Sequence, residues 1–570
     1  MENIEQIRHS LAHLLASAVL EFYPKTKLGI GPAIENGFYY DMALPKEFKP
    51  EDLPKIEARM RELIKENQEF VGKKVSKITA KKLFAKQPYK LELIKDLKEG
   101  TLTTYQNGAF LDLCRGGHVE NTKEIDLNSF KLTKIAGAYW KGSEKNAMLT
   151  RIYGVAFENA VKLQEYLNMQ EEAEKRDHRV LGQKLGLFMF HETAPGMPYW
   201  LPKGLSLYNE LVNFWRKEHV ALNYQEISSP LVNKAELWHT SGHWEHYKED
   251  MFIANMGENE IYGIKPMNCP NAMVVFNSMQ VSYKDLPLRL SDTDKLHRYE
   301  RSGTLNGLLR VRAFQQDDSH NFISEDMIAS EYNHIFDICK NFYGIFGLTY
   351  SFRLGTRPEK FLGEKATWDK AEAELKKILE KSGVPYTVKE GDGAFYGPKV
   401  DIVMKDSLGR DWQMGTIQLD FQLPQRFHLN YIGQDGTKKT PVVVHRVIYG
   451  SLERFIGILI EHTAGAFPLW LSPVQIAVIP ISEKHVEYAK QVAGRLQVAG
   501  CRLQVMDENE SLGKKIREAE MQKIPYLLIM GDKEIAANSV GVRQRGKGDL
   551  GAMAFEAFLE KIAQEIKEKK

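Results

Sequence analysis

The chain has 570 residues, of which 43% are hydrophobic and 27% charged, a composition typical of folded globular proteins. At about 150 residues per domain, this length predicts three or four domains. The net charge of +2, from 77 basic and 75 acidic residues, excludes a strongly basic nucleic-acid binder, so any RNA contact must come from local patches.

Signals for export, membrane insertion and disulfide bonding are absent from the sequence. No run of about 18 apolar residues indicates a membrane span, and the segment MENIEQIRHS lacks the basic start and apolar run of a secretory signal. The four cysteines form no C-x-x-C pair, which fits a reducing compartment better than a disulfide framework. We therefore expect a cytoplasmic protein with no membrane partner.

The N-terminal part alternates helical and strand-like patterns. Residues 8–22 have the pattern of an amphipathic helix. Residues 28–42 have the pattern of two strands joined at the turn signal Asn36-Gly37. Residues 73–90 contain seven lysines and no acidic residue, which indicates a solvated face or an RNA contact. Residues 156–180 contain neither Gly nor Pro and predict one long polar helix that joins two units.

The remainder of the chain predicts two further domains. Its central part has strand-like runs that follow one another in sequence, which favours an antiparallel sheet flanked by helices; the runs are residues 224–232, 286–299, 308–318, 399–406 and 411–424. Residues 474–481, 501–507 and 525–532 are short apolar strands separated by helical segments, as in a small α/β domain. The expected fold is multidomain α+β, with these boundaries: a first domain at 1–155, a linker helix at 156–180, a central domain at 181–470 and a C-terminal domain at 471–570.

Common nucleotide-binding loops are missing. No G-x-G-x-x-G follows a strand, and the segment from Gly541 to Gly548 ends in glycine where a P-loop needs Ser or Thr for Mg²⁺. ATP would therefore need a different scaffold. Three segments of the central domain supply one: the helix YNELVNFWRKEHV with the strand that ends at Pro230, then HRYE (297–300) with RVRAF (310–314), then GSLERF (450–455). In this order they resemble motifs 1, 2 and 3 of the class II aminoacyl-tRNA synthetases.

The resemblance implies an ATP site rich in arginine, because guanidinium groups donate bidentate hydrogen bonds to phosphate and stay ionised. Arg298 would hold the α-phosphate and the amino-acid carboxylate, Glu300 would accept from the adenine amino group, and Phe314 would stack on the base. The catalytic residues implied are Arg298, Glu300 and Arg454. The implied ATP-binding set adds Arg310, Phe314, Lys399, Gln413, Gln418 and Ser451, with Mg²⁺ on the phosphates.

Within this class, five segments resemble the threonyl-tRNA synthetase family: KPMNCP (265–270), FQQDDSH (314–320), AFYGPK (394–399), DWQMGTIQLDF (411–421) and HRVIYGSLERF (445–455). Carried over residue by residue, Cys269, His320 and His445 would be ligands of one Zn²⁺. One thiolate and two imidazoles leave the fourth position open to the amino and hydroxyl groups of threonine. The implied threonine-binding residues are Met267, Gln316, Asp318 and Tyr396.

Serine keeps the hydroxyl of threonine and lacks one methyl group, which a pocket distinguishes by only about 1–3 kcal/mol. A second, hydrolytic site is therefore expected. His9-x-x-x-His13 and Cys114-x-x-x-His118 resemble the editing domain shared by threonyl and alanyl synthetases, which implies that these residues and Asp112 hydrolyse mischarged seryl-tRNA. By chemistry alone, three imidazoles and a thiol equally fit a zinc site, so metal occupancy stays open.

The C-terminal domain resembles the anticodon-binding domain of the threonyl, prolyl, histidyl and glycyl synthetases. Single-stranded loop bases are read by Arg stacking and by hydrogen bonds to base edges. The residues implied are Asn509, Arg517, Glu534 and Arg543. The resemblance further implies threonine tRNA, ATP and L-threonine as partners, a homodimer built around motif 1, and a form without the ubiquitin-like module that often precedes the editing domain.

Two alternatives remain at this point. Another class II synthetase, such as a prolyl or alanyl enzyme, shares some of these motifs, although the alanyl enzyme lacks this C-terminal domain. A synthetase-like protein that binds RNA without catalysis is the other. The presence of Arg298, Glu300, Arg454 and the Cys–His–His set argues against it.

Overall fold

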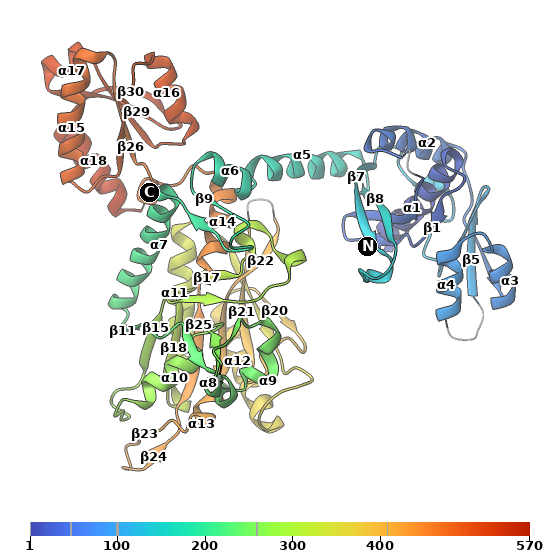
Figure 1. Cartoon of the computed structure of the whole chain (residues 1–570), viewed down its shortest axis with the longest axis horizontal. Coiled ribbons are helices and arrows are strands. Elements are labelled where there is room, and N and C mark those ends of the chain that lie inside the picture. The colour runs from blue at the N-terminus through green and yellow to red at the C-terminus, as the bar shows by residue number, and fades with distance from the viewer. Residues whose placement is uncertain (1, 46–47, 98–101, 258–259, 407–408, 570) are drawn as a thin grey trace. The chain divides into compact units, whose positions relative to one another are not determined.

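The computed structural model describes residues 2–45, 48–97, 102–257, 260–406 and 409–569, which form two compact units, Met1–Glu172 and Ala173–Lys570 (Figure 1). Each unit has its own buried apolar core. Among the described residues, no helix is long and apolar enough to cross a membrane.

The first unit packs helix α1 (Glu2–Phe22) against an antiparallel sheet. The sheet has the order β1 (Lys27–Leu28), β3 (Gly37–Ala43), β8 (Met148–Ala156), β7 (Phe130–Tyr139), with β2 (Ala33–Ile34) on β3. The core between them includes Leu11, Leu15 and Val19 of the helix with Phe38 and Ile152 of the sheet. The other elements are α2 (Leu53–Lys65), α3 (Lys77–Leu83), α4 (Pro88–Asp96), and a sheet of β4 (Val71–Val75), β5 (Leu102–Asn107) and β6 (Phe110–Leu113).

Two local predictions for this part of the chain are wrong in detail. The hairpin turn is Glu35-Asn36, because Ile34 pairs with Gly37, which is the first residue of β3. A side chain at Gly37 would meet the carbonyl oxygen of Gly154 at 2.0 Å, so the strand needs glycine there. The predicted single helix is instead α5 (Ala160–Arg176) followed by α6 (His178–Lys184), because Asp177 has ψ 118 and caps α6 through a hydrogen bond from the Arg179 backbone.

The second unit contains an eight-stranded sheet that is antiparallel in its interior and parallel at both edge pairs. Its order is β11 (Tyr224–Ile227), β15 (Leu288–Asp292), β18 (Asp318–Ile323), β25 (Val442–Val447), β22 (Asp411–Asp420), β21 (Lys399–Lys405), β19 (Tyr350–Gly355), β20 (Tyr386–Lys389). The predicted antiparallel sheet is thus confirmed for its centre, where the candidate site lies.

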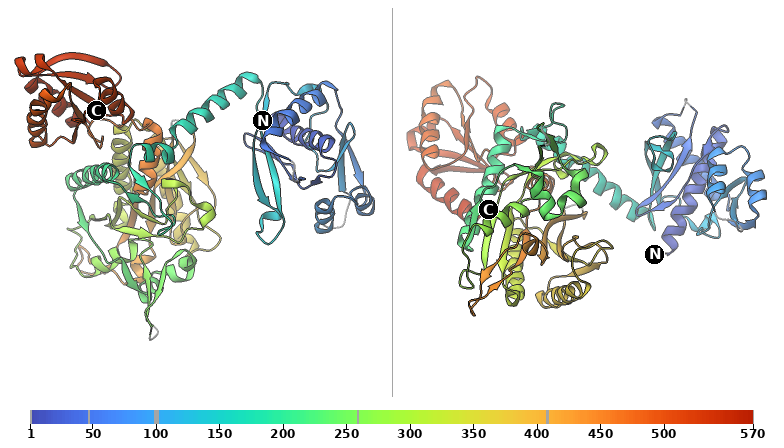
Figure 2. Two further views of the ribbon diagram at one scale, coloured as in Figure 1. Left: turned by 45° about the horizontal axis from the view of Figure 1, so that its top comes forward. Right: turned by 60° about the horizontal axis from the view of Figure 1, so that its bottom comes forward.

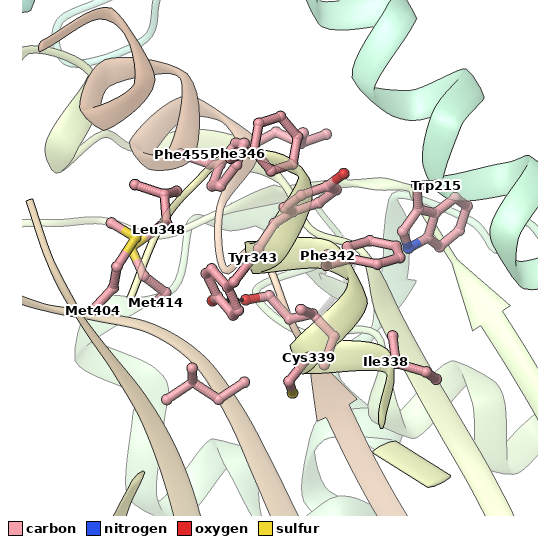
Figure 3. Close-up of a cluster of buried hydrophobic side chains, with 14 of the residues drawn as sticks. Trp215, Ile338, Cys339, Phe342, Tyr343, Phe346, Leu348, Met404, Met414 and Phe455 are labelled. Atoms are coloured by element: carbon pink, nitrogen blue, oxygen red, sulfur yellow. Dashed lines mark hydrogen bonds between the residues drawn. The ribbon is translucent and has the colours of Figure 1, made fainter. Parts of the chain in front are cut away.

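Helices cover one face of this sheet and form its core with it. Figure 3 shows Phe346, at the C-cap of α11 (Ile328–Ile345), next to Phe455 of α14 (Leu452–Thr463), and Met414 of β22 next to Met404 of β21. The rings of Phe346 and Phe455 are 4.9 Å apart. This apolar layer anchors the helix that carries the third motif. The remaining helices of this part are α7 (Pro202–Ala221), α8 (Ala235–Ser241), α9 (His243–Tyr247), α10 (Cys269–Asn277), α12 (Lys365–Ser382) and α13 (Leu423–Arg426).

Short strands complete the central part. β14 (Ile261–Ile264) lies between β12 (Val232–Lys234) and β13 (Ile253–Asn255) in a three-stranded sheet. The other short strands form pairs: β9 (Phe188–Met189) with β10 (Tyr199–Trp200), β16 (Lys295–His297) with β17 (Ala313–Gln315), and β23 (Tyr431–Ile432) with β24 (Lys438–Lys439). β16 and β17 pair antiparallel and overlap the two segments of the second motif, at His297 and at Ala313-Phe314.

The C-terminal part is a five-stranded mixed sheet with helices on both faces (Figure 2). The three predicted strands are confirmed as β26 (Ile476–Pro480), β27 (Leu503–Val505) and β28 (Tyr526–Met530), which are parallel. β29 (Ser539–Gln544) and β30 (Gly548–Ala554) extend the sheet antiparallel. Helices α15 (Val486–Val498) and α18 (Phe555–Lys567) pack on one face, and α16 (Leu512–Met521) packs on the other; α17 (Asp532–Ala537) joins β28 to β29.

Candidate active site

Four neighbouring strands align four candidate residues in one row. His320 of β18 is paired with His445 of β25, His445 with Gln418 of β22, and Gln418 with Lys399 of β21. Directly opposed residues on neighbouring strands lie on the same face of a sheet. All four side chains therefore line one cavity of ≈ 340 Å³.

The same cavity is lined by every residue that the sequence predicts for ATP, threonine and metal. Those residues are Met267, Cys269, Arg298, Glu300, Arg310, Phe314, Gln316, Asp318, His320, Tyr396, Lys399, Gln413, Gln418, His445, Ser451 and Arg454. Its lining also includes residues that the sequence did not single out, namely Tyr247, Leu309, Val311, Met414, Thr416, Arg446 and Val447.

At one end of the cavity, Cys269, His320 and His445 offer ligand atoms that all lie within 4.8 Å of one another. Cys269 is the first residue of α10, and all three side chains are buried. Neither ring nitrogen of His320 has a hydrogen-bond partner, nor has Nδ1 of His445. Buried polar atoms are rarely left unpaired, because desolvating them without a partner costs free energy. A metal ion bound here would be coordinated by these atoms and would remove that cost, so the arrangement fits a metal site.

The protonation of the trio also fits a metal. Burial lowers the pKa of His320 well below its ordinary value, so the ring is neutral and has a free lone pair. Burial raises the pKa of the Cys269 thiol, which a bound cation would have to offset by taking the thiolate. His445 Nε2 lies 2.8 Å from Asp420 Oδ2, so the carboxylate orients the ring and leaves Nδ1 toward the trio. The sequence did not identify Asp420.

At the other end, three guanidinium groups face the cavity. Arg454 donates from Nε to the Leu309 carbonyl at 2.9 Å and from Nη1 to the Gln413 carbonyl at 2.8 Å. Burial, and then the charges of Arg310 and Arg298, lower the pKa of Arg454. Since like charges gathered in a partly buried cavity repel one another, this end is suited to a polyanion.

The second motif forms the floor and one wall of the cavity. The Arg298 guanidinium lies 5.0 Å above the ring of Phe314, a cation–π distance. Glu300 pairs with Arg310, with Arg310 Nε 2.9 Å from Glu300 Oε2. Helix α14 begins at Ser451, whose hydroxyl accepts from the Arg454 backbone at 3.0 Å. The second and third motifs thus meet where Arg454 donates to the Leu309 carbonyl.

The first unit holds a second cluster, formed by His9, His13, Cys114 and His118, whose ligand atoms lie within 4.8 Å of one another. Cys114 Sγ is 3.4 Å from His9 Nε2 and 3.2 Å from His118 Nε2. Ser10 Oγ lies 3.3 Å from His118 Nδ1. The predicted histidine pair on α1 therefore meets the predicted C-x-x-x-H loop.

The predicted Asp112 lies beside this cluster, and two residues that the sequence missed, Lys90 and Tyr40, contact it. Asp112 lies 3.8 Å from His13 Nε2 and forms an ion pair with Lys90, and Tyr40 donates a hydrogen bond to the same carboxylate. Lys90 is 1% exposed, although it ends the lysine-rich segment that predicted a solvated face. That prediction is confirmed for Lys73, Lys74, Lys81, Lys82 and Lys86, and wrong for Lys90.

Burial sets the protonation of the second cluster as well. It lowers the pKa of His9, lowers that of His13 further, and lowers that of His118 to about 2. It raises the pKa of the Cys114 thiol to about 11. Near neutral pH the cluster therefore holds three neutral imidazoles and a protonated thiol. Gly116 and Gly117, with φ 98 and 86, let the loop fold back so that Gly116 N reaches Cys114 Sγ at 3.3 Å.

The four predicted anticodon residues are spread over the C-terminal sheet and its helices. Asn509 and Arg517 are exposed, the latter on α16. Arg543 of β29 lies 3.6 Å from Glu520 of the same helix. Glu534 of α17 accepts from the Gly531 backbone at 3.0 Å. The structure brings Arg543 toward the helix of Arg517. Among the described residues, no direct contact joins Asn509 or Glu534 to this pair.

Three family models match successive parts of the chain. Residues 252–463 match the tRNA synthetase class II core domain (G, H, P, S and T), and residues 475–565 match the anticodon binding domain. Residues 102–153 match the threonyl and alanyl tRNA synthetase second additional domain. The last match covers Asp112, Cys114 and His118.

Relatives match over nearly the whole chain. The threonine–tRNA ligase of Carboxydothermus hydrogenoformans is 51% identical over 572 residues, which cover 100% of this chain and 90% of that protein. That of Thermotoga neapolitana is 50% identical over 570 residues, covering 99% and 89%. Among solved structures, the RNA binding domain of threonyl-tRNA synthetase from Cryptosporidium parvum Iowa II aligns with a TM-score of 0.66 and 43% identity, covering 68% of this chain and 98% of that one.

Proposed function

Because the chain belongs to the threonine–tRNA ligase family, we propose that it joins L-threonine to threonine tRNA with ATP, and that a second site hydrolyses seryl-tRNA. The observation that carries the proposal is the cavity that unites Arg298, Arg310 and Arg454 with a buried Cys–His–His trio. We assign activation to residues 181–470, editing to residues 1–155, anticodon binding to residues 471–570, and the link between units to residues 156–180.

In the activation step, a threonine carboxylate oxygen attacks the α-phosphorus of ATP. The bond from that phosphorus to the bridging oxygen breaks, and pyrophosphate leaves with the negative charge. Arg298, Arg310 and Arg454 would stabilise that charge, and Mg²⁺ would neutralise the phosphates further. No protein nucleophile is needed, because the acid and the nucleotide react directly once they are aligned. Transfer to the 3′-terminal adenosine of the tRNA then releases AMP.

Selection of threonine would depend on the trio. Cys269, His320 and His445 would hold Zn²⁺ and leave one position open. When bound, the ion supplies a Lewis acid that the amino and hydroxyl groups of threonine can reach, whereas valine has no hydroxyl to offer. Asp318 would accept a hydrogen bond from the hydroxyl. Asn268 Nδ2, 3.1 Å from Asp318 Oδ2, orients that carboxylate.

For the editing step we propose a metal-free site. The neutral imidazole of His9, whose pKa burial lowers least of the three, can accept a proton from a water molecule that attacks the seryl ester. The raised pKa of Cys114 argues against a thiolate nucleophile. Lys90 pairs with Asp112 and neutralises the carboxylate beside the cluster, which would otherwise compensate the charge of a bound cation.

A homodimer and a cytoplasmic location complete the proposal. Apolar side chains within and beside the first motif are exposed, namely Leu205, Val220, Leu231 and Val232. A second copy of the chain would cover them. Sedimentation velocity should give one species of twice the chain mass; a monomer at micromolar concentration would refute the dimer. The four unpaired cysteines support the cytoplasm.

The test of the proposed function is amino-acid-dependent exchange between ATP and pyrophosphate. Threonine should drive exchange strongly, and valine, proline and alanine should not. Cys269→Ala should lower the threonine-dependent rate about 10³-fold, since several kcal/mol of Lewis-acid stabilisation are lost. Cys339→Ala, which removes a buried thiol in the apolar core, is the matched control and should retain exchange. Exchange with proline or alanine and not threonine would overturn the assignment.

A further inference from the structure

A third group of titratable residues, the half-buried Asp177 with the buried His178 and Glu461, lies where α6 meets the C-terminal end of α14. His178 is 1% exposed. Its Nδ1 lies 2.7 Å from Glu461 Oε1, and its Nε2 lies 3.0 Å from the backbone nitrogen of Leu308. A backbone N–H can only donate, so Nε2 of His178 accepts this hydrogen bond. Nδ1 therefore carries the ring proton and donates a hydrogen bond to Glu461.

These contacts exclude a metal-binding role for this group. The lone pair of Nε2 is directed at a peptide N–H, so it is not free for a cation. The second oxygen of Glu461 pairs with Arg410, which also contacts Asp406 Oδ2 at 2.6 Å. Asp177 accepts from the Arg179 backbone at 2.7 Å as the cap of α6. His178 is therefore a hydrogen-bonded bridge between a helix and a loop.

The loop that His178 holds belongs to the ATP site. Leu308 is the middle residue of a short 3₁₀ helix, Gly307–Leu309, in the second motif. The carbonyl of the next residue, Leu309, accepts from Arg454 Nε at 2.9 Å, and Arg310 then pairs with Glu300. The approach is close, because a Cβ on Gly307 would lie 2.3 Å from His178 Nε2. One imidazole thus ties the third-motif helix to the second-motif loop, one residue before the contact that orients Arg454.

We propose that His178 is a positioning residue for the ATP site: its imidazole bridges Glu461 and the Leu308 amide and so fixes the Leu309 carbonyl that orients Arg454. This inference rests on the proposed function and adds a residue to it. His178 lies outside the cavity lining, so it would touch neither substrate. Its loss should therefore weaken the handling of ATP while leaving the Cys–His–His trio and its selection of threonine intact.

The experiment compares His178→Phe with wild type in ATP–pyrophosphate exchange, with the full chain. His178→Phe fills the volume and removes both hydrogen bonds. We expect kcat/KM for ATP to fall about 100-fold, as misplacement of a positioned group does, with the KM for threonine and the zinc content unchanged. His178→Gln keeps one donor and one acceptor and should recover about tenfold of that loss. Unchanged ATP parameters in His178→Phe would overturn the inference.

A matched control separates positioning from packing. His485 is also a buried imidazole, and it lies between the Ser482 backbone nitrogen at 3.1 Å and Asp532 Oδ1 at 3.2 Å, in the C-terminal part of the chain. His485→Phe should leave both KM values at wild type, because it has no contact with the second motif. An equal loss of ATP handling in His485→Phe would show a general effect of removing a buried histidine and would overturn the inference.

Two further measurements allow the inference about His178 to be tested separately from the proposed function. If wild type shows no threonine-dependent exchange, the proposed function fails, and calorimetry with ATP alone still decides the inference: the Kd for ATP should rise about tenfold in His178→Phe, and an unchanged Kd refutes it. If His178→Phe does not fold, Glu461→Gln replaces it, with the same expected loss for ATP and the same refutation by unchanged ATP parameters.

Discussion

The two Cys–His clusters of the chain use the same ligand types and differ in what surrounds them. In the catalytic unit, both ring nitrogens of His320 are without partners, and Asp420 orients His445. In the first unit, the Cys114 sulfur contacts the rings of His9 and His118, and Ser10 contacts the other ring nitrogen of His118. Among the buried side-chain atoms of that cluster that the structure describes, His13 Nδ1 has no partner.

The difference teaches that the identity of the ligands does not by itself define a metal site. A cluster whose buried atoms lack partners gains most from an ion, because the ion removes the desolvation cost. A cluster whose atoms pair with one another has less to gain, and the ion pair with Lys90 neutralises Asp112, which could otherwise compensate a bound cation. The first arrangement suits zinc, and the second suits proton transfer.

Among the variants that test this difference between the two clusters, Lys90→Met should have the largest effect. The change leaves Asp112 buried without its cation, which lowers the free energy of unfolding by about 3–5 kcal/mol, as for other broken buried ion pairs. Urea unfolding should detect this loss, and hydrolysis of seryl-tRNA should fall with it while threonine-dependent exchange persists. Lys86→Met, in the same lysine-rich segment but exposed, is the control. Equal midpoints and equal hydrolysis in the two variants would refute the buried role of Lys90.

A smaller effect is expected from Asp420→Asn. The amide weakens the hydrogen bond that orients His445, so affinity for zinc should fall about 10–100-fold. Competition with a chelator measures this affinity. Asp411→Asn, on the exposed end of the same strand β22, is the matched control and should bind zinc as wild type does. Zinc affinity insensitive to Asp420→Asn would show that the carboxylate does not serve the metal ligand.

The smallest expected effect is a pH dependence of stability from the first unit. The pKa of His118 is about 2 when folded and 6.5 ordinarily, so the unfolded chain binds more protons between these values, and stability is lost as pH falls below about 6.5. The pKa of Cys114 is about 11 against 9.0, so stability is also lost as pH rises above about 9. The urea midpoint of the full chain should fall more between pH 7 and 5 in wild type than in His118→Gln. Parallel slopes would contradict the buried, neutral imidazole.

The sequence predicted the types of most elements, and motif resemblance grouped the candidate residues, but two strands that carry metal-ligand candidates escaped the pattern. β18 (Asp318–Ile323) is buried at every position and β25 (Val442–Val447) nearly so. Strands buried on both faces do not alternate polar and apolar residues, so the period-two signal is missing.

The sequence did not identify the residues that contact the site residues, for a different reason. Lys90 in a lysine-rich segment, Asp420 at the end of a strand and His178 after a charged helix look like surface residues in sequence. Their burial follows from tertiary packing, and their contacts span 22, 25 and 283 positions respectively. Only the three-dimensional structure brings such distant residues to one place.

The most direct measurement is the zinc content per chain of wild type, Cys269→Ala and Cys114→Ala, determined by mass spectrometry of metal after exhaustive dialysis. We predict one zinc per chain in wild type, one in Cys114→Ala and none in Cys269→Ala. Two zinc ions in wild type, or a zinc ion lost from Cys114→Ala and kept in Cys269→Ala, would contradict the assignment of metal to the catalytic sheet and of proton transfer to the first unit.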